Sequence, residues 1–317
     1  MTLDPLMALA SFGVSIVVGL TGMGGGALMT PVLVLFFGVQ PLAAVSSDLV
    51  ASAVMKPIGS AVHLRRGTVH LPMVRWLMLG SVPGAFGGVL VARALGDGEA
   101  VQRGVRIALG VALLVAAAGL TIRAYTRLVQ RARKRDGRLP RLPDGPPKVV
   151  VRPVPTVIVG LLGGLVVGLT SVGSGSLIII ALMVLYPGLA ANELVGTDLL
   201  QAVPLVMSAA AGHLLFGDFK LEITASLLLG CIPGVWLGAQ LSSRAPGGLV
   251  RRVLAFVLLA SALKLLNLST PATGAILLAS LCVAPPLWMA LRRRHGLPAL
   301  AHRDRPPAVP VAVVVPD

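Results

Sequence analysis

The sequence predicts an all-α polytopic membrane protein, and composition is the first reason. Of the 317 residues, 56% are hydrophobic and only 12% are charged, with a mean hydropathy of +0.89. A soluble domain carries about 25% charged residues, so this chain lies far outside that class. Apolar runs long enough to span a bilayer recur along nearly all of it.

The second reason is where the positive charge lies. The net charge is +15, yet no lysine or arginine precedes Lys56, and dense basic sets occupy 123–152 and 292–305. Connections and tails of this kind face the cytoplasm in membrane proteins and lie near anionic lipid. We therefore expect membrane lipid as a partner, no nucleic acid, and a cytoplasmic linker and C-terminus.

The third reason is an internal repeat. Asp48 matches Asp198 and His63 matches His213, each 150 positions later, and Pro83-Gly84 returns as Pro233-Gly234 at the same separation. Agreement of unrelated residue types in one register indicates two homologous repeats.

Each repeat is expected to contain a glycine-interrupted pair of short helices followed by three spans. The short pairs are 6–20 with 27–37 and 156–169 with 177–186; the spans are 42–64, 71–95 and 104–125, then 192–216, 221–241 and 249–268. Pieces of roughly 15 and 11 residues reach about 22 and 17 Å, less than the roughly 30 Å of hydrocarbon. They form either re-entrant hairpins or tilted, discontinuous spans. With re-entrant hairpins each repeat crosses three times, and the second repeat is inverted relative to the first.

The resulting organisation has five parts. They are membrane repeat 1 (1–125), a basic cytoplasmic linker (126–155), membrane repeat 2 (156–268), an extra C-terminal helix (269–291) and a basic, proline-rich cytoplasmic tail (292–317).

The glycine breaks are the predicted binding elements. One reads GLTGMGGG from Gly19 to Gly26, and the other GLTSVGSG from Gly168 to Gly175. Glycine costs a helix about 1 kcal/mol relative to alanine, and backbone N–H groups freed inside a membrane must be buried or line a polar cavity. A helix that begins after each break would turn its N–H groups and positive dipole end toward a small anion. The alternative is close helix packing through small residues.

The predicted anion-binding residues combine these glycines with neighbouring hydroxyls. They are Thr21, Gly22, Gly24, Gly25, Gly26, Thr170, Ser171, Gly173, Ser174, Gly175 and Ser176.

Ionisable and polar residues inside the spans form a second candidate set, for coupling or gating. An ionisable group in a membrane is a functional hypothesis by default. Asp48 and Asp198 either couple transport to protons or serve as structural carboxylates. Lys56, whose counterpart is Val206, pairs with Asp48 or attracts the anion, or else its side chain extends toward the membrane interface. The other members are Gln201, a polar lining residue, and His63 and His213, which near span ends are typical of interfacial histidines.

Several of these stretches resemble the TauE/SafE sulfite exporter family, also called the toluene-sulfonate uptake permeases. The resemblance rests on Gly22-Met23-Gly24-Gly25-Gly26-Ala27-Leu28-Met29-Thr30-Pro31, on Gly196-Thr197-Asp198 and on Gly212-His213, and it covers about 6–268. It implies a carrier of the bacterial inner membrane that moves sulfur-containing anions such as sulfite, sulfonates or thiosulfate. The second copy departs from the pattern where Ser174 interrupts the glycines and Ile180 replaces a proline. This departure bears on the substrate and not on the membrane architecture.

The predicted function is therefore secondary transport of a small anion, with protons as possible co- or counter-transported partners. An anion channel is the main alternative, since the same helix N-termini can line a pore; a structural or sensory membrane protein is another. An intramembrane aspartyl protease is disfavoured because neither Asp48 nor Asp198 lies in a Gly-x-Gly-Asp setting. No metal site or cofactor is expected, and the oligomeric state does not follow from the sequence.

Overall fold

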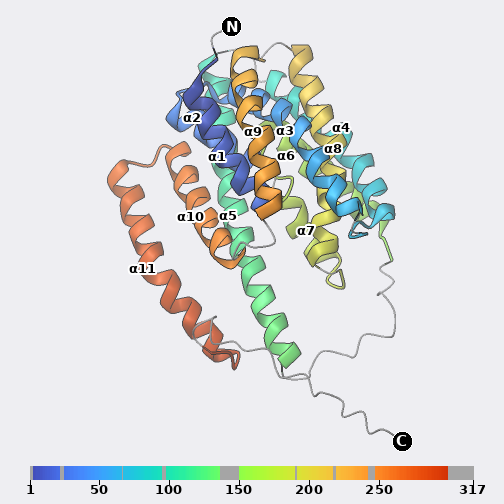
Figure 1. Ribbon diagram of the computed structural model, residues 1–317, viewed down its shortest axis with the longest axis vertical. Helices are drawn as coiled ribbons and strands as arrows, with labels where there is room; N and C mark the ends of the chain where they lie inside the picture. The colour runs from blue at the N-terminus through green and yellow to red at the C-terminus, as the bar shows by residue number, and fades with distance from the viewer. Residues whose placement is uncertain are drawn as a thin grey trace, which may run out of the picture.

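The computed structural model describes residues 3–21, 25–65, 67–94, 98–135, 150–189, 191–216, 219–241 and 247–298. Within these ranges the chain forms eleven α-helices and no strand (Figure 1). The first predicted repeat holds α1 (Pro5–Thr21), α2 (Gly26–Phe36), α3 (Pro41–Arg65), α4 (Leu71–Ala94) and α5 (Glu99–Arg135). The second holds α6 (Pro153–Thr170), α7 (Leu177–Leu185), α8 (Ala191–Phe216), α9 (Leu221–Leu241) and α10 (Gly247–Leu265), and α11 (Thr270–Arg294) follows.

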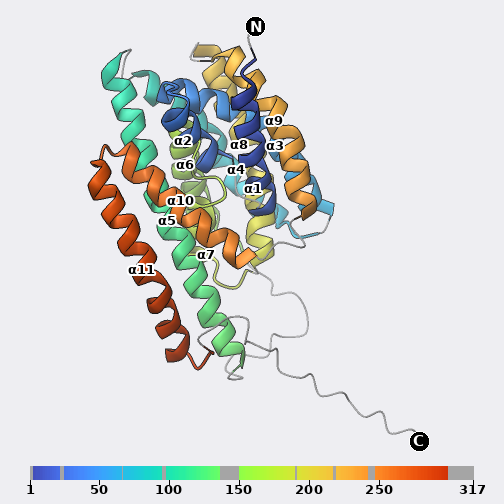
Figure 2. The ribbon, with the colours of Figure 1, turned by 60° about the vertical axis from the view of Figure 1, so that its left-hand side comes forward.

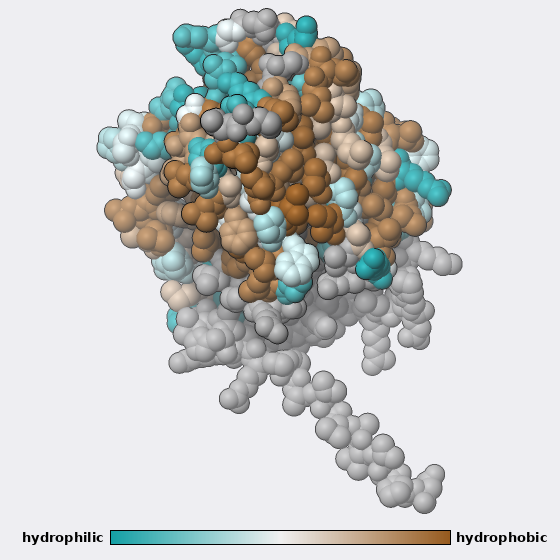
Figure 3. All heavy atoms as spheres, turned by 45° about the horizontal axis from the view of Figure 1, so that its top comes forward, coloured by the Kyte–Doolittle hydropathy of each residue, from teal (hydrophilic) through white to brown (hydrophobic). Residues whose placement is uncertain are grey.

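Seven of the described helices are long and apolar enough to cross a membrane. They are α3, α4, α5 as far as Val129, α6, α8, α9 and α11. Apolar side chains cover much of the face in Figure 3, and large ones such as Leu79 on α4 and Leu229 on α9 are more than half exposed. A soluble monomer rarely exposes so much contiguous apolar surface. The predicted all-helical, multi-pass architecture is confirmed, whereas the inverted repeat stays a prediction.

Two helices, α5 and α6, differ most in length from the expectation. α5 continues past 125 to Arg135, so the start of the predicted linker is helical, as its arginines and glutamine favour. α6 begins at Pro153, a residue type suited to the first helical turn, and has 18 residues. At 1.5 Å per residue it is about 27 Å long, and it is one of the seven helices long and apolar enough to cross a membrane, whereas α1, the first helix of the other break, is shorter. The linker from 136 to 149 and the tail from 299 lie outside the described residues.

The two halves pack on each other reciprocally. α4 packs along α6, and α9, which the predicted repeat matches to α4, packs along α1. Both contacts are made by glycines four residues apart, which lie on one helix face. A methyl group added at any of them would collide with the backbone of the partner helix. The glycines are Gly80, Gly84 and Gly88 on α4, and Gly230, Gly234 and Gly238 on α9. The first helix of each half is thus held by the other half, through the close small-residue packing that membrane helices use.

The centre and the periphery of the bundle are clearly different. α3 is the most enclosed of the seven long apolar helices, and it contacts α8, α9 and α2. α11 lies outside, beside α10, with its apolar side chains exposed (Figure 2). Figures 1 and 2 show α5 and α11 extending furthest from the end that carries the N-terminus. The polar residues singled out above therefore concentrate on the enclosed helices, around α3 and α8.

Candidate functional site at the helix breaks

The second break has a defined backbone. α6 ends where Ser171 adopts a left-handed conformation, with φ of 56°, and donates its amide to the Val167 carbonyl. Gly173 and Gly175 follow with φ of 135° and 99°, values that glycine adopts readily and other residues rarely do. α7 then begins at Leu177. The positive φ angles at positions 173 and 175 therefore favour glycine at both.

The first break touches the second. α1 ends at Thr21 and α2 begins at Gly26; Gly22, Met23 and Gly24, between them, lie outside the described residues. Gly26 lies against Ser171 so closely that an added methyl group would collide with the Ser171 carbonyl oxygen. Gly26 and Ser171 are both buried. Two segments almost 150 residues apart in the chain thus meet inside the protein.

Asp48 on α3 connects these two breaks. Its Oδ2 accepts hydrogen bonds from Thr30 Oγ1 on α2, at 2.9 Å, and from Ser171 Oγ in the second break, at 2.6 Å. Its side chain is completely buried, and Oδ1 has no hydrogen-bond partner among the described residues. Ser52 Oγ, one turn further along α3, is also buried without a partner there. Both oxygens face the Cα of Gly25, each 3.5 Å from the position of an added methyl group.

Lys56 crosses from α3 to the second break. Its Nζ donates a hydrogen bond to Ser174 Oγ, and only 6% of the side chain is exposed. It interacts electrostatically with Asp198 and with Asp48. The alternative that the Lys56 side chain extends toward the membrane interface is therefore wrong. A buried cation is costly, so it is retained where charges or ligands compensate it.

Asp198 on α8 accepts its direct hydrogen bonds from its own half. Gln201 Nε2 donates to its Oδ1 at 3.0 Å, and the backbone of Gly175 also hydrogen-bonds it. Ser81 Oγ on α4 donates to Gln201 Oε1 at 3.0 Å, so the amide of Gln201 is fixed at both ends. Asp198 and Gln201 are both buried. Gln201 acts here as a partner of the carboxylate.

The two predicted histidines have different surroundings. His213 is completely buried: Nδ1 lies 2.9 Å from Ser46 Oγ on α3, and Nε2 lies 3.1 Å from the Gly168 carbonyl on α6. The interfacial interpretation is wrong for His213, because α3 and α6 cover this end of α8. His63 is half-buried, and its Nδ1 lies 3.0 Å from Thr68 Oγ1 in the turn that follows α3. It remains compatible with an interfacial position.

The remaining hydroxyls of the predicted site make mostly local contacts. Thr21 Oγ1 donates to the Val17 carbonyl one turn earlier, at 2.8 Å. Thr170 Oγ1 lies 2.6 Å from the Val166 carbonyl and accepts the Val172 amide at 3.2 Å. Ser176 precedes α7 and is buried. Thr21 and Thr170 therefore serve the helix ends, whereas Ser171 and Ser174 connect the two halves.

Three residues of this network were not predicted. Thr30, Ser46 and Ser81 supply hydroxyls to Asp48, His213 and Gln201 respectively. Serines and threonines are common in membrane helices, so composition alone did not separate these from the rest. The position of Ser46 two residues before Asp48, on an enclosed helix, was the available signal.

Together these residues make a buried polar centre in an apolar bundle. In the described part of the chain it contains the ammonium of Lys56, the carboxyl groups of Asp48 and Asp198 and several hydroxyls, drawn from both halves. Ammonium, hydroxyl and amide donors suit a small oxyanion, while carboxyl groups can carry protons.

Comparison with known proteins gives two kinds of similarity. The model of the family described as "Sulfite exporter TauE/SafE" matches residues 7–265. Probable membrane transporter protein YjnA of Bacillus subtilis (strain 168) is 35% identical over 254 residues, which are 80% of this chain and 96% of that protein. Probable membrane transporter protein YdhB of the same organism is 24% identical over 241 residues, 76% of this chain and 91% of that protein. No solved structure matches the chain.

Proposed function

The chain belongs to the TauE/SafE sulfite exporter family of multi-pass membrane transporters, which are not enzymes, and we propose that its cargo is a small sulfur-containing oxyanion. Sulfite, thiosulfate and small sulfonates are the members of this class to test. The membrane is the inner membrane of a bacterium, with the linker and C-terminal tail on the cytoplasmic side.

The observation that carries this proposal is the meeting of the two breaks. Gly26 of the first lies on Ser171 of the second, and Lys56 of the first half binds Ser174 of the second. An anion bound here would be held by donors from both halves. Any change in the relative position of the helices that carry these donors would then change the site, as alternating access requires.

The reciprocal packing supports the inverted-repeat part of the proposal. If α1 corresponds to α6 and α4 to α9, the α4–α6 contact becomes the α9–α1 contact under exchange of the halves. α3 would correspond to α8, and α5 to α10. Each of these two pairs is in contact, so exchanging the halves leaves the α3–α8 and α5–α10 contacts unchanged. This pattern is the one that a two-fold relation between the repeats produces.

The proposal assigns Asp48 and Asp198 the coupling of anion transport to proton transfer. Transfer of a proton to a buried carboxylate offsets charge that an arriving anion brings into the low-dielectric interior. We assign the larger share to Asp48, because one of its oxygens has no partner among the described residues.

Transport by purified protein in proteoliposomes tests the proposal. Wild-type protein should give saturable uptake of at least one of labelled sulfite, thiosulfate or a small sulfonate, and a pH gradient should change the rate. Lys56→Met should reduce the apparent affinity about ten- to a hundredfold, the equivalent of one charge-assisted hydrogen bond. Val206, the matching residue on α8, is apolar, so a methionine at 56 gives α3 the same kind of residue as its predicted counterpart helix has there.

Lys264→Met is the matched control. Lys264 on α10 is half-buried and donates to Thr270 Oγ1 at 2.9 Å, far along the chain from the breaks. Its removal should leave uptake within about twofold of wild type, as for most surface substitutions. Unitary currents would favour the channel alternative, and absence of flux for every sulfur anion would overturn the cargo assignment.

A further inference from the structure

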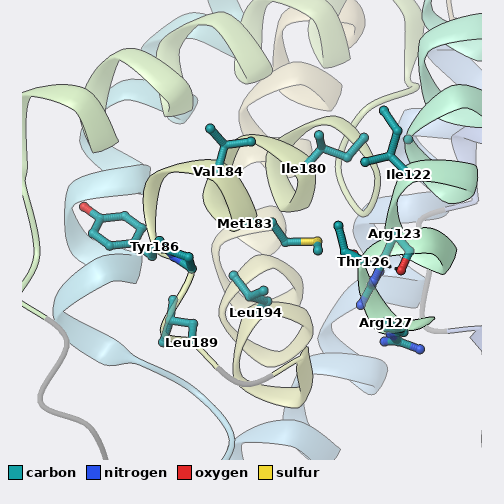
Figure 4. Close-up of a pocket in the computed structure, with 12 residues that line it drawn as sticks. Ile122, Arg123, Thr126, Arg127, Ile180, Met183, Val184, Tyr186, Leu189 and Leu194 are labelled. Carbon is teal, nitrogen blue, oxygen red and sulfur yellow. Dashed lines mark hydrogen bonds between the residues drawn. The ribbon is translucent and has the colours of Figure 1, made fainter. Parts of the chain in front are cut away.

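A pocket separate from the helix breaks lies between α5, α7 and the start of α8. The space not filled by protein atoms there, counted together with the part that is open to the surroundings, is about 790 Å³. Most of its lining is apolar, with Met183 of α7 and Leu194 of α8 among the walls. Figure 4 shows the α5 residues of the pocket facing the side chains of α7, with Met183 pointing toward Thr126.

The polar side of this pocket is basic. Arg123 and Arg127 both line it, and they lie one turn apart on the same face of α5. Only 8% of Arg123 is exposed, although it lies inside the apolar part of α5 that ends at Val129. An arginine buried at membrane depth is expensive and marks a site where anions or carboxylates collect.

The apolar side of the pocket opens outward. Ile122 of α5 is 53% exposed and Val184 of α7 is 80% exposed, and both line the pocket. In a membrane such side chains face lipid tails. The pocket therefore offers guanidinium groups at its base and an apolar rim continuous with the bilayer.

We propose that this pocket binds one anionic phospholipid, with the phosphate at Arg123 and Arg127 and an acyl chain along Ile122 and Val184. A soluble anion would use the two arginines but not the apolar rim, and a neutral lipid would use the rim but not the arginines. The chain that follows supports this assignment, because Arg131, Arg133, Lys134 and Arg135 continue the basic character of α5. Basic segments of this kind lie beside anionic headgroups.

The lipid would act on the helix breaks through two elements. α7, which forms one wall, starts directly after the second break. Arg123 also interacts electrostatically with Asp198. An occupant that holds Arg123 and α7 would therefore influence the second half of the polar centre. The site itself does not depend on which anion is transported.

Thermal unfolding of the full-length protein in detergent tests the site, with dioleoyl phosphatidylglycerol or dioleoyl phosphatidylcholine added. The phosphatidylglycerol should raise the midpoint of the wild type by about 3 °C or more, since a ligand that binds only the folded state stabilises it. The double variant R123Q/R127Q should lose most of that shift, and Arg103→Gln, an exposed arginine at the other end of α5, should keep it. An equal shift with phosphatidylcholine, or an equal shift with inorganic phosphate alone, would overturn the proposal.

A second measurement needs no variant. Phosphatidylglycerol with a photoreactive group in its acyl chain is added to wild-type protein, irradiated, and the labelled peptides are identified by mass spectrometry. Labels on α5 and α7 around Ile122 and Val184, displaced by excess phosphatidylglycerol but not by phosphatidylcholine, support the site. Labels distributed over the whole apolar surface, without enrichment there, overturn it.

Discussion

The two repeat-equivalent aspartates, Asp48 and Asp198, have very different surroundings. Asp48 reaches across to the other half, where Ser171 donates to it, and one of its oxygens has no partner in the described part of the chain. Asp198 is held by Gln201 and Gly175 of its own half. Lys56 has no equivalent, because Val206 stands at the matching position. Matching positions of the two predicted repeats therefore have different chemical surroundings, and we expect the first half to respond to charge while the second provides rigid support.

The largest expected effect is at the point where the halves touch. Gly26→Ala places a methyl group against the Ser171 backbone, which cannot move aside as a side chain can. We expect a loss of about 3 kcal/mol of stability, at the upper end of overpacking penalties, and no measurable transport. The checks are the thermal midpoint in detergent and uptake in proteoliposomes. Gly13→Ala on exposed α1 surface, with nothing within 4 Å, should instead gain about 0.5–1 kcal/mol. If Gly26→Ala behaves like Gly13→Ala, the halves do not meet here.

The next effect separates the two carboxylates. Asp48→Asn removes the charge that two hydroxyls solvate, and uptake driven by a pH gradient should fall about a hundredfold, the equivalent of 2–3 kcal/mol. Asp198→Asn keeps an oxygen for Gln201, so its uptake should stay within about fivefold of wild type. Initial rates at several gradients check both variants, with thermal midpoints measured in parallel. If the two variants lost uptake equally, Asp48 and Asp198 would not differ in function as we expect.

The smallest effect distinguishes the two histidines. His213→Gln weakens contacts that join α8 to Ser46 on α3 and to the Gly168 carbonyl on α6, and should cost about 1–2 kcal/mol of stability. His63→Gln in its half-buried turn should cost less than about 0.5 kcal/mol. Thermal unfolding in one detergent at matched protein concentration gives the comparison. If His63→Gln lost more stability than His213→Gln, burial of the histidine would not be what determines the cost of the substitution.

The helices were predictable from the sequence because membrane spans are long apolar runs bounded by glycine, proline and charge. The predicted span 221–241 coincides with α9, and 192–216 differs from α8 by one residue. The extension of α5 was missed because a basic segment that leaves the membrane has no apolar periodicity to reveal its helix.

The contacts of the site were much less predictable. Sequence spacing identified Asp48 and the breaks, but not that Ser171 would donate to Asp48, since such contacts depend on how distant helices pack. The burial of His213 was missed for the same reason: its position near a span end indicates depth along the helix, not what covers it. Lys56 was identified because a lysine in an apolar run is conspicuous, and its partner Ser174 came only from the structure.

The glycine contacts between α1 and α9 and between α4 and α6 restrict how this protein can move. Helices joined backbone to backbone have no side-chain layer to absorb sliding, so each pair must travel as one body. Each such body is assembled from both repeats. We therefore expect any motion of the transporter to occur between these mixed bodies and not between the two predicted repeats.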